Sequence, residues 1–380
     1  MGIFATNLSV FMPKAKMICR TMSVRLKIIP IYYLLALTPL AVVLEFLHAD
    51  HVLIFVASGI AIVPLAKLIG DATEHLAVHY GALTGSLLNV TFGNAAEVII
   101  ALAALNAGLF ELIKASITGS IIGNVLLVFG FSLLAGGLKK KEQTFNSSNA
   151  GVQTSMLFLA VIGLAVPTIL AQTELSAGTA LNQNNIQLMS DALAFTLLAV
   201  YIASIVFSLI THKHLFVTPE EEYEHVKLWS KARAFSFLAI SMAMVAVVSE
   251  ILVGSVQATS KEFGFGELFV GAVIVGLVGN VAEHSSAITL ARKDKLDTSI
   301  GIAAGSATQI ALFVVPLLVI AGIILGKPLT LVFTLYELAA IFLSSIIMNL
   351  IAHDGKSNWF EGVMLTAVYV IIGIGFYFIG

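Results

Sequence analysis

Gly93-Asn94-Ala95-Ala96-Glu97 sets an amide and a carboxylate inside a long run of apolar residues, and the same frame returns as Gly279-Asn280-Val281-Ala282-Glu283. We call these stretches the first and second motifs. A glutamate in the middle of a hydrophobic helix costs roughly 2.5–3.5 kcal/mol on an insertion scale. A chain that carries this cost twice, in one five-residue frame, is expected to use both carboxylates. The repetition therefore predicts one shared cation site.

The composition around the motifs is that of a membrane protein. Of the 380 residues, 58% are hydrophobic and 11% are charged, and the mean hydropathy is +0.99. Soluble domains carry about 25% charged residues. Long, continuously apolar runs indicate membrane helices and not the short alternating segments of a barrel. Cys19 is the only cysteine, which excludes internal disulfides and cysteine-based metal sites. We expect an all-α polytopic membrane protein and not a soluble enzyme.

About eleven apolar stretches are long enough to cross a bilayer. Their expected ranges are 31–48, 52–73, 84–106, 111–136, 151–171, 187–210, 232–254, 267–290, 299–324, 329–351 and 359–379.

The distribution of basic residues predicts the orientation of the chain. Residues 1–30 carry five Lys and Arg and no acidic residue, and they do not resemble a cleaved signal peptide. With this arm in the cytoplasm, 16 of the 20 Lys and Arg fall on the cytoplasmic side, whereas Lys114, Lys261 and Lys327 fall outside and Lys67 lies within a span. This asymmetry is what the positive-inside rule expects.

An internal repeat organises the spans. The offset of 186 residues that superimposes the motifs also superimposes Gly119-Ser120 on Gly305-Ser306. We therefore expect two five-helix repeats, which the odd number of spans inverts relative to each other. The resulting divisions are an N-terminal arm (1–30), a leading helix (31–48), a first repeat (49–210), a cytoplasmic loop (211–230) and a second repeat (231–380). The loop contains several glutamates and is interpreted either as a solvated linker or as an acidic patch that gathers cations.

The donor atoms of the motifs indicate the ion. Each motif offers a carboxylate, an amide oxygen and, where its glycine loosens the helix, backbone carbonyls. Such hard oxygen ligands suit Ca2+ better than zinc or copper. Two carboxylates neutralise a divalent ion, and without the ion their mutual repulsion makes protons the natural replacement. This alternation provides a physical basis for antiport.

The motifs, with Val98 and His284 following them, resemble the two signature segments of the Ca2+/H+ antiporters within the cation/Ca2+ exchanger superfamily. The resemblance extends from about residue 31 to the end of the chain. It implies that Glu97 and Glu283 bind Ca2+ and exchange it for protons, assisted by Asn94 and Asn280.

Polar residues on the following spans fit the same resemblance. Ser306 and Gln309 look like the family's hydrophilic patch, and Ser120 and Asn124 are their counterparts in the first repeat. Under the 186-residue offset Gln309 falls opposite Gly123, so Asn124 is one residue out of register. For the two serines, ordinary helix packing is the alternative.

Other ionisable residues have two interpretations each. Glu74, near the inner end of its span, and Glu250, near the outer end of its span, are expected to gate two access pathways or to be interfacial carboxylates. His284 either titrates near neutral pH or packs against neighbouring helices. His75 and His79 lack the order and the further ligand of a zinc site, and Glu337, inside the tenth span, is either a hydrogen-bonded helix contact or an accessory proton site.

The sequence thus predicts a Ca2+/H+ antiporter working by alternating access in a lipid bilayer. A Na+/Ca2+ exchanger is the nearest alternative, and a cation channel is less favoured because an inverted repeat around one site suits a carrier. No nucleophile–base constellation supports an enzyme. No cofactor and no nucleic acid partner is expected, and homo-oligomerisation is left open. The plasma membrane of a prokaryote is the favoured location, with a vacuole-like membrane as the alternative.

Overall fold

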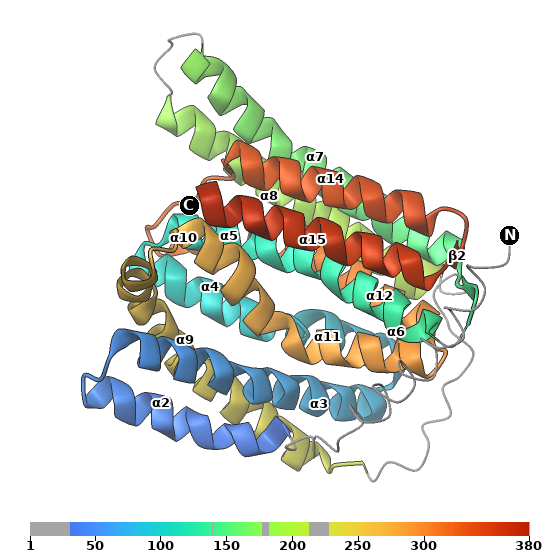
Figure 1. Ribbon diagram of the computed structural model, residues 1–380, viewed down its shortest axis with the longest axis horizontal. Helices are drawn as coiled ribbons and strands as arrows, with labels where there is room; N and C mark the ends of the chain where they lie inside the picture. Colours follow the sequence, from blue (N-terminus) through green and yellow to red (C-terminus); the bar gives the residue numbers. More distant parts are fainter. Residues whose placement is uncertain (1–30, 139, 177–181, 213–227, 380) are drawn as a thin grey trace, which may run out of the picture.

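The structure, a computed structural model, describes residues 31–138, 140–176, 182–212 and 228–379 (Figure 1). The N-terminal arm and most of the predicted acidic loop lie outside these residues. Within the described part, nine helices are long and apolar enough to cross a membrane, and Ile31–Phe46 and Ala95–Ala107 are shorter apolar helices. The expectation of an all-α polytopic membrane protein with about eleven membrane helices is confirmed.

The described residues of the first half form eleven elements. They are η1 (Ile31–Ala36), α2 (Leu37–Phe46), α3 (His51–Phe92), α4 (Ala95–Ala107), α5 (Phe110–Ile122), η2 (Gly123–Val128), α6 (Phe129–Gly137), β1 (Gln143–Thr144), α7 (Ser147–Ser176), α8 (Gln183–Val206) and η3 (Phe207–Thr211).

Ten elements follow among the described residues from 228 to 379. They are α9 (Lys231–Phe263), α10 (Glu267–Phe269), η5 (Val270–Val275), α11 (Gly276–Arg292), α12 (Leu296–Gln309), η6 (Ile310–Val314), α13 (Val315–Ile324), α14 (Leu335–Ala352), β2 (Lys356–Ser357) and α15 (Trp359–Ile379).

Local sequence signals fix the ends of the two longest helices. The Asp50 side chain accepts hydrogen bonds from the amides of Val52 and Leu53 at the start of α3, and the Ser230 hydroxyl accepts one from the Arg233 amide at the start of α9. Both residues satisfy amides that lack partners in a first helical turn. Helix α9 ends at Gly264, whose φ of 67° suits a glycine.

Helix α3 turns back on itself between the expected second and third spans. A Cβ on Gly85 would lie 2.9 Å from Cα of Ala77. Residues eight apart in a straight helix are about 12 Å apart, so the helix axis must reverse between these two residues. The expected spans 52–73 and 84–106 are therefore joined by a tight helical bend, and the second of them is interrupted after Phe92.

Two π-helical segments repeat at the same offset as the motifs. Moved by 186 residues, η2 would cover 309–314, and η6 covers Ile310–Val314. Such segments widen one turn of a helix and are frequent at functional sites. The repeat is therefore present in the backbone as well as in the sequence.

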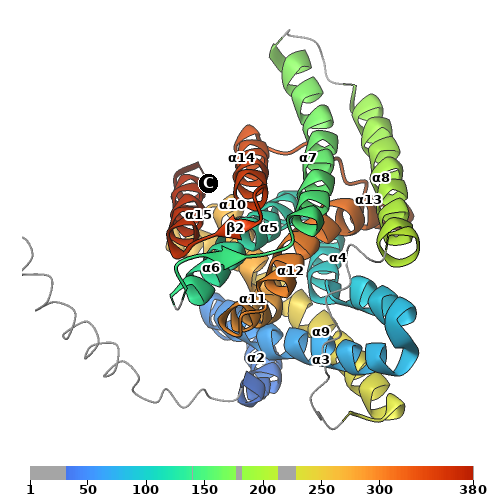
Figure 2. The same ribbon diagram turned by 90° about the vertical axis from the view of Figure 1, so that its right-hand side faces the viewer.

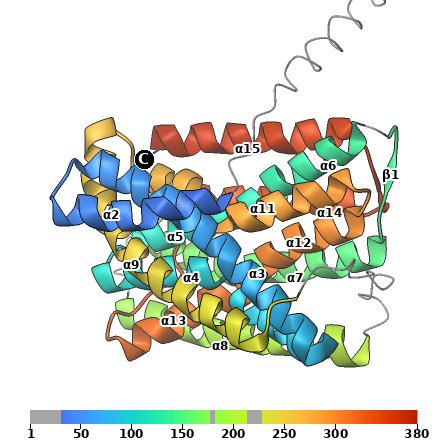
Figure 3. The same cartoon turned by 90° about the horizontal axis from the view of Figure 1, so that it is seen from below.

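The helices form layers that place the motifs in the interior. In Figure 2, α2, α3 and α9 lie along the bottom, α4, α11 and α12 lie above them, and α7 and α14 lie farther up with α8 beside them. Figure 3, seen from below, shows α2, α3 and α9 in front of the other helices. Helices α3 and α9 pack along each other, α9 also contacts α4, and α3 contacts α11. The two long helices thus cover the two helices that carry the motif glutamates.

A short antiparallel strand pair joins two loops that are far apart in the sequence. Gln143 of β1 pairs with Ser357 of β2, and Lys356 forms an ion pair with Glu142 at 3.0 Å. The hydrogen bond and the charge of Glu142 raise the pKa of the Lys356 amine above its usual value. These contacts join the loop after α6 to the loop before α15.

Candidate cation site

The two motifs have the same sequence frame but different backbones. At the first motif the helix breaks: α3 ends at Phe92, Asn94 is the residue before α4 with φ −100° and ψ 24°, and Glu97 lies in the first turn of α4. The second motif lies inside α11, which is continuous from Gly276 and is preceded by the π-helix η5. The expected loosening of the backbone is therefore observed at the first motif and not within the second.

Each motif glutamate packs against the glycine of the other motif. A Cβ on Gly279 would lie 3.1 Å from Cγ of Glu97 and 3.3 Å from its Oε1, and a Cβ on Gly93 would lie 3.7 Å from Oε1 of Glu283. Each carboxylate therefore lies beside the backbone of the other motif. The missing side chain of each glycine gives the opposite carboxylate its space, so the two motifs interlock.

A continuous hydrogen-bond network joins the two halves around this contact. Asn94 Nδ2 donates to Gln309 Oε1 at 2.7 Å, and Ser306 Oγ donates to Asn94 Oδ1 at 3.3 Å. Asn124 Nδ2 donates to Ser306 Oγ at 3.0 Å and to Asn280 Oδ1 at 3.2 Å. The network therefore runs from one motif amide to the other through two residues of the following spans.

At its far end the network reaches the backbone of the second half. Asn280 Nδ2 donates to Ser120 Oγ at 3.0 Å and to the Gly276 carbonyl at 2.9 Å. The 186-residue offset relates the contact between Asn94 and Ser306 to the contact between Asn280 and Ser120. The six predicted polar residues Asn94, Asn280, Ser120, Asn124, Ser306 and Gln309 are therefore brought together in one network.

Three oxygens at this site are left without partners. Glu97 Oε2, Glu283 Oε2 and Asn124 Oδ1 are buried and accept no hydrogen bond from the described residues. Buried acceptors in native proteins are nearly always paired, and leaving one unpaired costs about 1–3 kcal/mol. Unpaired oxygens gathered beside a polar network are suited to a cation or to protons.

The donor set fits a hard divalent ion. In the described part of the chain, no three His, Cys, Asp or Glu side chains gather as a metal cluster. The donors are instead two carboxylates and amide oxygens, and a Ca2+ ion takes six to eight oxygens of this kind, with water supplying the remainder.

His284 directly follows Glu283 and is half-buried. Its Nε2 is buried without a hydrogen-bond partner among the described residues. The ring is thus outside the amide–hydroxyl network.

Glu74 and Glu250 lie at different depths on the paired long helices, and both side chains are exposed on the surface of the chain. Glu250 is two residues from Leu252, and Leu252 lines one cavity together with Gly59 and Val278. Because Val278 directly precedes the second motif, Glu250 lies at about the depth of that motif. Glu74 lies 15 residues beyond Gly59 on α3, which corresponds to about 22 Å of helix. Helix α9 continues to Phe263, so Glu250 lies deeper than the outer end of the span where it was expected.

The two histidines near Glu74 bind the start of α9. The His75 ring stacks on Trp229 with centroids 4.5 Å apart, and His79 Nε2 lies 2.7 Å from the Trp229 carbonyl oxygen. These contacts account for the histidines without a metal.

Glu337 lies at the start of α14 and not well inside a span. Its carboxylate accepts hydrogen bonds at 2.8 Å from the amide and the hydroxyl of Thr334, and its own amide donates to Thr334 Oγ1. Because α14 begins at Leu335 and not near residue 329, Glu337 completes a capping box.

Sequence reasoning missed Gly276, which packs against Gly119 and brings the two halves into contact. A Cβ on Gly276 would lie 2.9 Å from the backbone of Gly119, and the Gly276 carbonyl accepts hydrogen bonds from Ser120 and Asn280. The signal in the sequence was a glycine three residues before the second motif, in a span already rich in small residues.

Comparisons with known proteins identify the family and the fold of the chain. The sequence profile of the family "Sodium/calcium exchanger protein" matches residues 51–210 and 233–378. The chain is 42% identical over 362 residues to a Ca(2+)/H(+) antiporter of Aphanothece halophytica, covering 91% of this chain and 95% of the relative. It is 40% identical over 343 residues to the Ca(2+)/H(+) antiporter ChaA of Bacillus subtilis (strain 168), covering 89% and 96%. The solved structure of native YfkE superposes with a TM-score of 0.80 at 37% identity, covering 92% of this chain and 99% of that chain.

Proposed function

This chain belongs to the sodium/calcium exchanger protein family, and from that premise we infer that it is a secondary antiporter that exchanges Ca2+ for H+ across a membrane. Two relatives with at least 40% identity, each matched over nearly its whole length, are Ca2+/H+ antiporters. The nine long apolar helices of the described chain make it an integral membrane protein.

We propose that Glu97 and Glu283 form the shared ion and proton site. The observation that carries this proposal is the cross-packing of each glutamate against the glycine of the other motif, which leaves one unpaired oxygen on each carboxylate. In the Ca2+-loaded state both carboxylates are ionised and neutralise the ion. In the return state protons occupy them, because two bare carboxylates this close in a medium of low dielectric constant repel each other.

The polar network positions the site. Asn94 and Asn280 are held by Ser306 and Ser120 from the opposite half, so their amide oxygens and the adjoining carboxylates keep a fixed spacing. Asn124 contributes its unpaired Oδ1 as a further ligand. Ligand-orienting groups of this type commonly change metal affinity 10- to 100-fold when removed.

Alternating access would involve the layer of α3 and α9. These helices cover α11 and α4, which carry the motif glutamates. Movement of the long helices against the motif helices would open the site to one side and then to the other. Glu74 and Glu250, separated in depth along this pair, are proposed to line the access pathways.

We further propose that the N-terminus is cytoplasmic and that the membrane is the plasma membrane of a prokaryote. The excess of Lys and Arg on one side supports the orientation. The cyanobacterial and Bacillus relatives support the choice of membrane.

The test is Ca2+ uptake into proteoliposomes under an imposed pH gradient, with and without a protonophore. Uptake that follows the gradient and collapses with the protonophore is the expected result. Uptake that ignores pH and follows a Na+ gradient would instead assign the protein to Na+/Ca2+ exchange. Flux that does not saturate and needs no counter-ion would identify a channel.

A further inference from the structure

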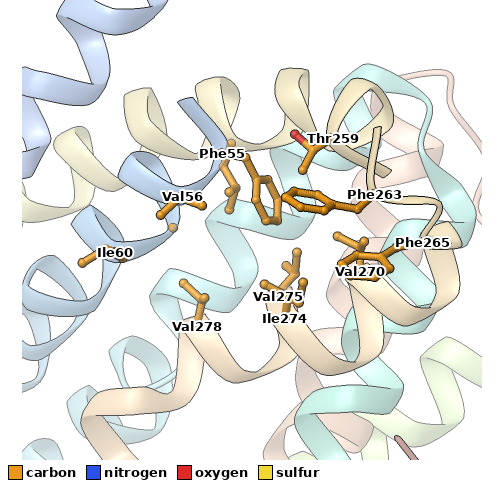
Figure 4. Close-up of a pocket in the computed structure, with 12 residues that line it drawn as sticks. Phe55, Val56, Ile60, Thr259, Phe263, Phe265, Val270, Ile274, Val275 and Val278 are labelled. Atoms are coloured by element: carbon orange, nitrogen blue, oxygen red, sulfur yellow. The ribbon is translucent and has the colours of Figure 1, made fainter. Parts of the chain in front are cut away.

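A cavity of about 270 Å3 lies between the two long helices and the helix of the second motif. Figure 4 shows side chains of α3, α9 and the η5–α11 segment projecting toward one shared space. Its lining includes Val56, Gly59 and Ile60 of α3, Leu252 of α9, and Ile274 and Val278 of the η5–α11 segment. All three walls belong to helices long and apolar enough to span a membrane.

The lining excludes water as a stable occupant. Thr259 is the one lining residue with a polar side chain, and its hydroxyl already donates to the His51 carbonyl at 3.2 Å. A buried water needs two to four polar partners. The side chains that line the cavity offer no free hydrogen-bond partner, so the cavity favours an apolar occupant.

The cavity opens on a face of the protein that meets lipid. Val56 and Ile60 form its edge on α3 and are 47% and 40% exposed. Phe263 and Phe265 stack with centroids 5.3 Å apart where α9 ends, and aromatic residues are typical of the level of the lipid headgroups. Deeper in, Leu252 and Val270 are fully buried. An opening among membrane-exposed residues gives a hydrocarbon chain a path inward.

From these observations we propose that the cavity is a binding site for one acyl chain of a bilayer lipid. The headgroup stays at the end of the bundle where α3 begins and α9 ends, and the chain extends between the helices toward Val278. That residue immediately precedes Gly279, against which Glu97 packs. The inner end of the acyl chain therefore lies beside the second motif, between the helices that cover the motifs and the helix that carries one of them.

The experiment uses the full chain in proteoliposomes that contain phosphatidylcholine with a photoactivatable diazirine on one acyl chain. After irradiation, mass spectrometry maps the labelled residues. We expect labelling at Ile274 and Val278, which line the cavity, in addition to general labelling of lipid-facing residues such as Phe195 and Ile202 of α8. Labelling confined to the lipid-facing residues would overturn the proposal.

A matched pair of variants sharpens this test. Gly59→Leu fills the cavity: a Cβ there meets only Leu252 and Val278, at 3.8 and 4.0 Å, so the remaining atoms extend into the empty space. Gly254→Leu adds the same atoms on α9 where a Cβ would meet nothing within 4 Å. We expect Gly59→Leu to lose most of the labelling at Val278, and Gly254→Leu to retain it.

A second variant keeps the test decisive if Gly59→Leu does not fold. Val56→Phe narrows the opening at a lining residue that is 47% exposed, and it is also expected to lose the inner labelling. Inner labelling that survives a folded cavity-filling or edge-narrowing variant contradicts the proposal. Because labelling is read without transport, this outcome is independent of whether the protein exchanges Ca2+ for H+.

Discussion

Glu97 packs against Gly279: a Cβ on that glycine would lie 3.1 Å from Cγ of the glutamate. The reciprocal contact, Glu283 against Gly93, relates to the first by the 186-residue repeat. A carboxylate from each half thus occupies the space left by a glycine of the other half. The site consequently exists only when the two repeats are assembled, and the glycines are as much part of it as the acids.

Replacing either motif glutamate by glutamine should abolish exchange. Glu97→Gln and Glu283→Gln keep the shape of the side chain but remove the charge that binds Ca2+ and the group that accepts a proton. Ca2+ uptake under a pH gradient measures the loss, and size-exclusion chromatography checks that each variant still folds. Glu262→Gln, an exposed position on α9, is the control and should transport normally. Flux that survives in either motif variant would refute the shared-site mechanism.

Gly279→Ala should weaken Ca2+ binding by about tenfold, the lower end of the range for changes that misplace a metal ligand. The added methyl would lie 3.3 Å from Oε1 of Glu97, tighter than ordinary contact, so the carboxylate must move. The apparent affinity for Ca2+ in uptake assays is the measurement. Gly305→Ala is the matched control, because a Cβ there meets nothing within 4 Å. Equal effects from both substitutions would show that the Glu97–Gly279 contact does not matter.

Ser306→Ala should lower Ca2+ affinity by about tenfold or more, because groups that orient metal ligands have effects of this size. The change removes a donor to Asn94 and an acceptor for Asn124. Ser120→Ala should behave similarly, since Ser120 holds Asn280. Ser345→Ala is the control: that hydroxyl is also buried but donates within its own helix, to Phe342. Affinity unchanged in both network variants would assign the serines to helix packing alone.

The coupling between ions should reflect two carboxylates that each take a proton. At equilibrium in proteoliposomes, the inside-to-outside ratio of Ca2+ concentrations should equal the inside-to-outside ratio of proton concentrations raised to at least the second power. A two-for-one exchange also moves no net charge, so membrane voltage should have little influence at that stoichiometry. Varying the pH gradient and the voltage separately measures both quantities. A first-power dependence on the proton ratio would mean that only one carboxylate is protonated.

The single cysteine makes the orientation of the chain directly measurable. Cys19 lies in the arm that the positive-inside rule assigns to the cytoplasm. A membrane-impermeant thiol reagent should therefore label it in inside-out vesicles and not in right-side-out vesicles. Cys19→Ser is the control for labelling elsewhere. The opposite pattern would reverse the assignment of every loop.

The sequence predicted the residues of the site more accurately than it predicted where the helices begin and end. The repeated frame identified both glutamates and both asparagines, and the same offset identified Ser120 and Ser306. Asn124 and Gln309 do not align under that offset, yet both join the network. Both residues lie where a π-helical segment begins, and the sequence carries no clear signal for such a turn.

The membrane class, the approximate number of spans and the paired acids followed from the sequence alone, because hydropathy, span length and the position of a carboxylate within an apolar run are local properties of the sequence. The tertiary structure decided which groups meet. It bent α3 between Ala77 and Gly85, broke the helix at the first motif but not at the second, and set Glu97 against Gly279. These features depend on contacts between residues more than 150 positions apart or on backbone packing. The linear sequence pattern does not show which residues contact each other, because these contacts form only when the two halves pack together.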